Sequence, residues 1–331
     1  MTVDLAEPLG ELLSDRWGID VVVGDANVVT AGARRLNAII TAATPDGVRK
    51  LVLTLLPAGA EVHNTLSAEA EMVALAEQHG VAVAHVEMSS DDASLLGGPF
   101  MITSFVAGET VPRRVLRLAA ERGHGERVVA QIGASLARLH AIPLAEAPTD
   151  LQRPEHPDPI EEAITTLYER LDELPVRRPA IELGLAWMSA HRPPPPPRPA
   201  IVHRDVRNGN IIVDDDGLAA ILDWEIALAG GDPMQDLAWT SVRMWRGRND
   251  AKEIGGLADR SALIEGYESA GGTYDAARFE WWKVSQTVWW SLGLAHQAES
   301  FLDGRVPDIV MAASGRRVSE LEWDLLMLLR P

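Results

Sequence analysis

The stretch 203–239 constrains this chain more than any other part, because it places two carboxylates and an amide at fixed intervals. It reads HRDVRNGNIIVDDDGLAAILDWEIALAGGDPMQDLAW. Asp205 closes a His-Arg-Asp tripeptide, Asn210 follows five residues later, and Asp223 ends the second of two short apolar runs. The polar turn between these runs predicts a β-hairpin over residues 211–222. The segment therefore brings an acid and an amide close to a second acid.

These residue types suit phosphoryl transfer, in which a protein mainly positions the reactants and neutralises charge. We assign Asp205 as the base that accepts the proton of an attacking hydroxyl. Asn210 and Asp223 supply oxygen ligands of the kind that Mg²⁺ prefers, and Arg207 is a fixed positive charge for the γ-phosphate. The competing interpretation is a chance tripeptide with its acids in solvated turns, which is what we expect of residues 214–216.

The same stretch resembles the aminoglycoside phosphotransferase/choline kinase-like superfamily. It is most similar to the branch whose kinase-like domains are fused to some acyl-CoA dehydrogenases, with the pattern HGDYRLGNLL…VLDWE…GDPLEDLAW. The matching residues are His203, Asp205, Arg207, Gly209, Asn210, Asp223, Trp224, Glu225, Gly231, Asp232, Pro233, Asp236, Leu237 and Trp239. Arg204 replaces the usual Gly, and one extra residue precedes Asp232. The resemblance covers most of the chain and is weakest in the first third.

The resemblance implies an α+β, bilobal protein-kinase-like fold, with a small β-rich N-lobe and a larger helical C-lobe. We expect the nucleotide-binding lobe over residues 1–106 and the catalytic and acceptor-binding lobe over residues 107–331, because β-like runs give way to helical stripes near Gly108. The implied function is an ATP- or GTP-dependent, Mg²⁺-requiring O-phosphotransferase acting on a hydroxyl of a small metabolite or antibiotic. The alternative is a nucleotide-binding pseudokinase or scaffold.

The family's nucleotide site maps onto three segments of the first third of the chain. Residues 31–35 form the loop over the phosphates, a helix from residue 67 carries the acid that pairs with a strand cation, and residues 101–108 form the hinge for adenine. The residues assigned to the nucleotide on this basis are Gly32, Arg34, Arg35, Glu69, Thr103 and Phe105. From the residues alone, a plain hairpin loop and an exposed helix face are equally compatible with the first two segments.

One departure from the family pattern concerns the strand cation. Thr54 stands where the fold places a Lys or Arg for the α- and β-phosphates. We therefore expect Glu69 to lack its partner and nucleotide binding to be weak, unless Arg34 or Arg35 replaces the missing cation. Lys50 is about 13 Å from Thr54 along a strand, which is too far for it to take that place.

Composition restricts the partners. The 331 residues carry a formal charge of −18 and no cysteine, which excludes disulfides and cysteine chemistry and argues against nucleic acid or an anionic membrane as partners. No apolar run approaches the ~20 residues of a membrane span, and residues 1–15 lack the pattern of a signal peptide. We expect a cytoplasmic protein whose partner is a small hydroxylated molecule. The oligomeric state is left open.

Two further expectations concern neighbouring segments. The tryptophans of residues 281–290 are expected to be mainly core. Asp223 and Pro233 lie too close in sequence for a phosphorylation-controlled loop, so Arg204 should serve the local backbone instead of a phosphoresidue.

Overall fold

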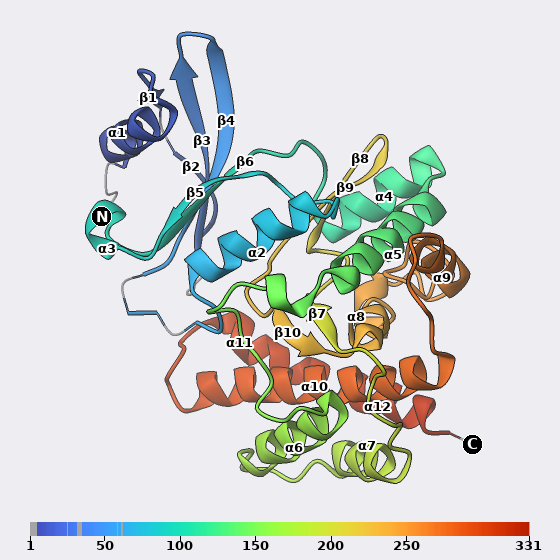
Figure 1. Cartoon of the computed structure of the whole chain (residues 1–331). Coiled ribbons are helices and arrows are strands. Elements are labelled where there is room, and N and C mark those ends of the chain that lie inside the picture. Colours follow the sequence, from blue (N-terminus) through green and yellow to red (C-terminus); the bar gives the residue numbers. More distant parts are fainter. Residues whose placement is uncertain (1–4, 25, 32–34, 58, 61, 331) are drawn as a thin grey trace.

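The computed structural model describes residues 5–24, 26–31, 35–57, 59–60 and 62–330. A twisted antiparallel sheet with a few helices stands on a larger, mainly helical region (Figure 1). The first region contains α1 (Ala6–Trp17), β1 (Val22–Val23), β2 (Asn27–Ala31), β3 (Leu36–Thr44), β4 (Gly47–Leu55), α2 (Leu66–Gln78), β5 (Val86–Ser90), α3 (Ala93–Leu96) and β6 (Phe100–Ser104).

The sheet has the strand order β1-β3-β4-β6-β5, with β2 also paired to β3. The longest pairing is the β3–β4 hairpin, which turns where Thr44 faces Gly47. Gly47 has a φ of 135°, a conformation that favours glycine and lets the chain turn at this point. After α2, Val81 donates its N–H to the carbonyl of Ala76 and closes the end of the helix, and the next strand, β5, begins at Val86.

The sheet packs against α1 on one face. Leu9 and Leu13, fully buried on α1, meet Ile40, Leu53 and Phe100 in a compact apolar cluster. The buried stripe of leucines at helical spacing is therefore what holds α1 to the sheet.

Helix α2 packs on both regions, since Leu66 and Ala70 lie in one apolar cluster with Met101 of β6 while its other face meets the helical region. Thr65, two residues before the cap expected from the sequence, accepts a hydrogen bond from the N–H of Ala68 and starts the helix. Met72 and Ala76 are fully buried in the same apolar cluster as the helices of the second region. The helix that carries Glu69 is thus anchored to the catalytic half of the molecule.

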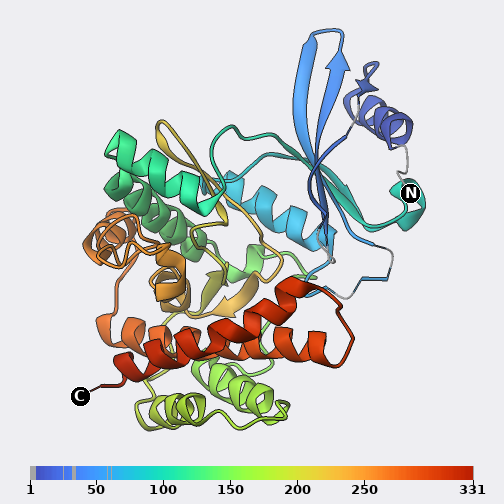
Figure 2. The same ribbon diagram turned by 180° about the vertical axis from the view of Figure 1, so that it is seen from behind.

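The second region is built from helices around two small sheets (Figure 2). It contains α4 (Pro112–Arg122), α5 (Gly125–Ala141), η1 (Leu144–Glu146), α6 (Pro159–Asp172), α7 (Pro179–Ala190), β7 (Ala200–Val202), β8 (Ile211–Asp214), β9 (Gly217–Ile221), β10 (Leu228–Gly231), α8 (Pro233–Trp239), η2 (Arg243–Arg246), α9 (Arg260–Ser269), α10 (Ala276–Leu302), α11 (Ile309–Ser314), η3 (Gly315–Arg317) and α12 (Val318–Leu328).

The predicted hairpin is confirmed as β8 and β9, which pair antiparallel from Ile211–Ile221 to Asp214–Gly217. At its turn the carboxylate of Asp214 accepts the N–H groups of Asp216 and Gly217. Strand β7, which precedes the catalytic segment, pairs antiparallel with β10, which follows it. The catalytic segment therefore begins and ends at the same small sheet.

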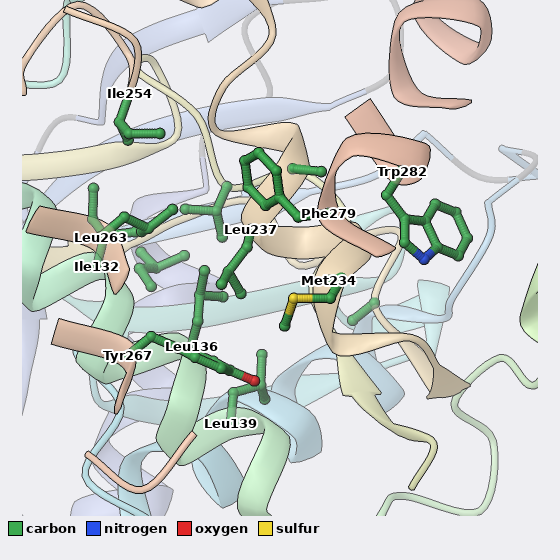
Figure 3. Packing of buried hydrophobic residues seen from close by; sticks show 14 of the residues in the cluster. Ile132, Leu136, Leu139, Met234, Leu237, Ile254, Leu263, Tyr267, Phe279 and Trp282 are labelled. Carbon is green, nitrogen blue, oxygen red and sulfur yellow. The ribbon is translucent and has the colours of Figure 1, made fainter. Parts of the chain in front are cut away.

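The core of this region joins α5, α8, α9 and α10 (Figure 3). Leu136 of α5 and Leu263 of α9 are fully buried, as is Phe279 of α10. The long helix α10 also buries Trp281 and Trp282 almost completely, which confirms the expectation that these tryptophans are core. This packing supplies the rigid base on which the loop after β7 rests.

Candidate active site

The loop between β7 and β8 is held from below by one carboxylate. Asp236, fully buried in the first turn of α8, accepts the backbone N–H groups of His203 at 2.8 Å and Arg204 at 2.6 Å. Its second support is Nε2 of His140, 3.0 Å away. Burial alone would raise the pKa of Asp236, but these bonds lower it below its ordinary value. Arg204 consequently holds a φ of 73°, where a non-glycine residue is strained.

Asp205 is bonded at both carboxylate oxygens. Oδ1 accepts Nε1–H of Trp239 at 2.8 Å and Nε–H of Arg207 at 3.1 Å, and Oδ2 accepts Nδ2–H of Asn210 at 2.5 Å. Burial, reinforced by the charge of Asp223, raises the pKa of Asp205 to about 6, although Arg207 lowers it. A carboxylate with this pKa is a stronger proton acceptor than an ordinary Asp and is still ionised at neutral pH.

Asn210 and Asp223 stand at the two ends of the hairpin. The amide Nδ2 of Asn210 donates to both the backbone carbonyl and the carboxylate of Asp205, so its Oδ1 is left for another partner. Leu222 donates its N–H to the carbonyl of Asn210 and brings the end of β9 back to the loop. Asp223 then takes a φ of 66°, and burial followed by the charge of Glu225 raises its pKa.

This donor set can be tested for its fit to Mg²⁺. Asn210 offers an amide oxygen, and the carboxylate of Asp223 has no hydrogen bond or ion pair with any residue that the structure describes. Within the described residues, no group of three or more His, Cys, Asp or Glu side chains could hold a metal ion. Two oxygen ligands fit Mg²⁺, which commonly binds through one or two protein groups and completes its shell with phosphates and water.

The structure corrects the expectation that Glu69 lacks a partner. Arg35 donates Nη1–H and Nη2–H to the two oxygens of Glu69, at 3.1 and 2.9 Å, and its Nη2 also lies 3.1 Å from Glu225. Burial lowers the pKa of Arg35, but the charge and hydrogen bonds of Glu69 raise it overall. Arg35, one of the two arginines that the sequence offered as a replacement for the strand cation, therefore pairs with Glu69.

The register of β3 and β4 explains the relocated cation. Thr54 lies opposite Asn37, and its hydroxyl is 2.8 Å from the Asn37 Oδ1. Arg35 is two residues before Asn37, and alternate residues of an extended chain point to the same face. Arg35, directly before β3, therefore reaches Glu69 from the segment beside β4, the strand on which the family pattern places its Lys or Arg.

Of the other four residues assigned to the nucleotide, the structure describes two. Thr103 lies on β6, between Val52 and Val86, and Phe105 follows the strand. The N–H of Phe105 is already bonded to the carbonyl of Lys50 at 3.1 Å, so it is not an available donor for a base. Gly32 and Arg34 lie outside the described residues.

The hinge is tied to the catalytic hairpin. Glu109 exchanges two backbone hydrogen bonds with Val213 of β8, at 2.8 and 3.0 Å. Gly108 has a φ of 145°, and a Cβ there would come within 2.6 Å of Ile212. Only glycine lets the chain pass this close to β8.

Two tryptophans belong to the site although sequence reasoning gave them no role in it. Trp239, fully buried, donates to Asp205, and the ring of Trp245 lies 4.8 Å beneath the guanidinium of Arg207. Their rings also meet each other, with centroids 4.9 Å apart. Trp239 matched the family pattern, but no signal in the sequence shows that its N–H points at Asp205. Trp245 lies in η2, after the end of α8.

Sequence and structure comparisons place the chain among phosphotransferases. The model of the phosphotransferase enzyme family matches residues 29–278. No curated protein matches the chain. No helix in the described part of the chain is long and apolar enough to span a membrane.

Solved structures of phosphotransferases share the fold along almost the whole chain. A protein of Ralstonia eutropha JMP134 assigned as an aminoglycoside phosphotransferase superposes with a TM-score of 0.68 at 20% identity, covering 96% of this chain and 97% of its own. The macrolide 2'-phosphotransferase of Brachybacterium faecium gives 0.61 at 17% identity, with coverages of 94% and 97%. The GDP complex of aminoglycoside 2'-phosphotransferase-IIIa gives 0.65 at 12% identity, with coverages of 96% and 99%. The expected bilobal, kinase-like fold is confirmed.

Proposed function

The chain belongs to the phosphotransferase enzyme family, and from this premise we propose that it transfers the γ-phosphate of ATP or GTP to an alcohol group, a hydroxyl of a small molecule. The observation that carries the proposal is the carboxylate of Asp205, held by Trp239, Arg207 and Asn210 with its pKa raised to about 6. Similar structures hold ADP with spectinomycin, and AMP-PNP with hygromycin B, which supports a nucleotide donor and a small-molecule acceptor.

Asp205 is the proposed base. Its Oδ1 is saturated by two donors, so the proton of the acceptor hydroxyl goes to Oδ2, whose protein donor is the Asn210 amide. Arg207, whose guanidinium carbon lies 4.8 Å from the ring centre of Trp245, is proposed to carry a positive charge toward the γ-phosphate. A static, bonded carboxylate needs little rearrangement during reaction.

Asn210 and Asp223 are the residues that would hold Mg²⁺, and the ion would supply charge neutralisation between the phosphates. Because Nδ2 of Asn210 donates to Asp205, the Oδ1 of Asn210 is the amide atom that remains free for the ion. Arg35 is proposed to take the α- and β-phosphates while Glu69 and Glu225 orient its guanidinium. Thr103 and Phe105 are proposed to border the base at the hinge. Gly32 and Arg34 remain proposals for the phosphate loop from the family pattern alone.

We propose residues 1–106 as the nucleotide lobe and residues 107–331 as the catalytic and acceptor lobe. Separate apolar cores beneath the sheet and among the helices support this division, with α2 as the element that packs across it. The second candidate, a nucleotide-binding pseudokinase, was favoured only by Thr54. The Arg35–Glu69 pair removes most of that support.

The test of this function is product formation. Purified protein is incubated with Mg-ATP or Mg-GTP and a panel of aminoglycosides, nucleosides, choline-like alcohols and hydroxy acids, and phosphorylated product is detected by mass spectrometry beside Asp205→Asn. Nucleotide-dependent product from the wild type alone is expected. Tight nucleotide binding with no product from any class would establish the pseudokinase instead.

A further inference from the structure

Within the part of the chain that the structure describes, two guanidinium groups near the catalytic loop have no carboxylate partner. Arg204 directly precedes Asp205, and Arg170 lies in the last turn of α6. Both side chains are partly exposed. Among the residues that the structure describes, neither has a carboxylate oxygen within 4.0 Å or a hydrogen-bond acceptor for its side chain. The expectation that the Arg204 side chain serves the local backbone is therefore not met.

Both groups are nevertheless withdrawn from water. Burial lowers the pKa of Arg170 and of Arg204 below the ordinary value of arginine. A guanidinium stays protonated at neutral pH even so. Each is therefore a desolvated positive charge whose usual compensation, a carboxylate within reach, is missing.

A chain of ring contacts links these charges to the base. The Arg170 guanidinium lies 5.7 Å from the ring centre of Trp289, which is partly exposed. The ring of Trp289 meets that of Trp239 at 5.3 Å, and Trp239 donates to Asp205. Arg170 and Arg204 are close enough for each other's charge to be unfavourable. Together they form a positive patch, and the ring contacts of Trp289 and Trp239 join it to Asp205.

The carboxylates nearest to this patch are committed elsewhere. Asp236 is occupied by the loop's N–H groups and His140. Glu162 accepts the backbone N–H groups of residues 155 and 156, at 3.3 and 2.9 Å. The charge of Glu173 acts on Arg170, but its carboxylate is largely exposed and lies 3.8 Å from His296. None of these acids can form an ion pair with the patch without losing a present contact or its hydration.

We propose that Arg170 and Arg204 bind an oxyanion of the phosphate acceptor, so that the substrate is an alcohol carrying a carboxylate or a phosphate monoester. This inference rests on the proposed function and deepens it. Guanidinium groups match the planar, two-oxygen geometry of such anions. One face each of Trp245 and Trp289 is already covered by Arg207 and Arg170, which leaves this side of the site unfavourable for a cationic acceptor.

The experiment uses matched acceptors and a binding assay that does not require turnover. The panel contains hydroxy acids of three to eight carbons and glycerol phosphate, each beside a neutral ester or unphosphorylated alcohol and an amino alcohol of similar length. Binding to the protein saturated with Mg-ADP is followed by titration calorimetry, and ADP release from Mg-ATP is followed separately. The variants are Arg170→Met, Arg204→Met and the control Arg177→Met, whose exposed side chain pairs with Glu182.

The expected result is a preference for the anionic member of a pair by about 10- to 100-fold in Kd or kcat/KM, as the loss of a charged hydrogen bond implies. Arg170→Met and Arg204→Met should reduce that preference without changing the KM for ATP, and Arg177→Met should leave it intact. Comparing carboxylates with glycerol phosphate distinguishes the two anions.

Three outcomes would overturn the inference: preference for neutral or amino alcohols, no binding of any anionic compound, or a preference that survives the Arg170→Met/Arg204→Met double variant. Arginine-dependent binding of anionic compounds without phosphorylation would instead contradict the proposed function and leave the anion site standing.

Discussion

The two ends of the candidate site are built in different ways. At the base end, Asp205, Asn210 and Asp223 come from one continuous loop and hairpin. At the phosphate end, Arg35 and Glu69 are 34 residues apart, and Glu225 joins them from the other half of the chain. The base end depends on a local motif that tolerates little change. The phosphate end needs only a cation in the right place, which either of two neighbouring strands can supply.

The strongest test of this difference between the two ends is to remove the base. Asp205→Asn is expected to lower kcat by about 10²–10⁴-fold, the usual contribution of a general base, with little change in Mg-nucleotide affinity. Product formation and nucleotide Kd are measured in parallel, with Asp216→Asn, in the exposed hairpin turn, as the control. Equal turnover by Asp205→Asn and the wild type would show that another group accepts the proton.

The relocated cation gives the next largest effect. Arg35→Ala should weaken Mg-ATP binding by about 10- to 100-fold, because a charged contact with the phosphates is lost. Arg35→Ala/Thr54→Lys should recover part of it, since the new ammonium would stand on the neighbouring strand, opposite Asn37. The control Arg49→Ala removes an exposed strand arginine that stacks on Trp17.

Removing Arg35 also leaves Glu69, 2% exposed, without its partner. An unpaired buried charge of this kind costs about 3–5 kcal/mol, so the melting temperature is measured for Arg35→Ala and for Arg35→Ala/Glu69→Gln. If the double variant regains stability but not nucleotide affinity, the role of Arg35 in binding is separated from its role in folding. Unchanged affinity in both would place the phosphate contact elsewhere.

The pH dependence tests the base end without a mutation. The pKa of Asp205 is raised to about 6, and a base must be deprotonated to act. Activity should therefore be constant above about pH 7 and fall as pH drops through 6, by about tenfold at pH 5. The profile of kcat/KM for the acceptor between pH 4.5 and 8.5 checks this. A fall centred on the ordinary pKa of Asp would contradict the buried environment of Asp205.

The raised pKa of Asp205 has the opposite effect on the stability of the fold: it favours folding at low pH, whereas activity is highest at high pH. A buried carboxylate with a raised pKa binds its proton more tightly in the folded state than in the unfolded state. Its contribution therefore favours folding at low pH and is lost as pH rises through about 6. Asp205 is thus placed for chemistry at some expense to stability near neutral pH.

The smallest effect is expected at Trp239. Trp239→Phe keeps a ring among the tryptophans and deletes one donor to Asp205, so kcat should fall by roughly three- to tenfold while KM for ATP is unchanged. Because that hydrogen bond lowers the pKa of Asp205, the acid limb of the pH profile should move upward. The matched control is Trp281→Phe, which removes an equally buried indole whose N–H bonds to the Met188 carbonyl at 3.0 Å. If the acid limb of the pH profile does not move in Trp239→Phe, the role of Trp239 is purely structural.

Local patterns in the sequence determined the hairpin, the helix opened by Pro233, and the segment that carries Asp205, Asn210 and Asp223. Their spacing sets them a few residues apart along one continuous piece of backbone, so short-range geometry alone brings them together. Asp236 also matched the family pattern, and in the structure it anchors the loop by accepting two of its N–H groups.

Only the tertiary structure decided the partner of Glu69, the direction of the Trp239 N–H and the isolation of Arg170 and Arg204. The sequence showed that Thr54 stands in place of the strand Lys or Arg. Arg35 reaches Glu69 only because β3 and β4 pair in a register that sets Thr54 opposite Asn37. Strand register, and the rotation of a buried ring, are fixed by contacts between residues far apart in the chain. No periodicity in a single sequence records which distant side chains will meet.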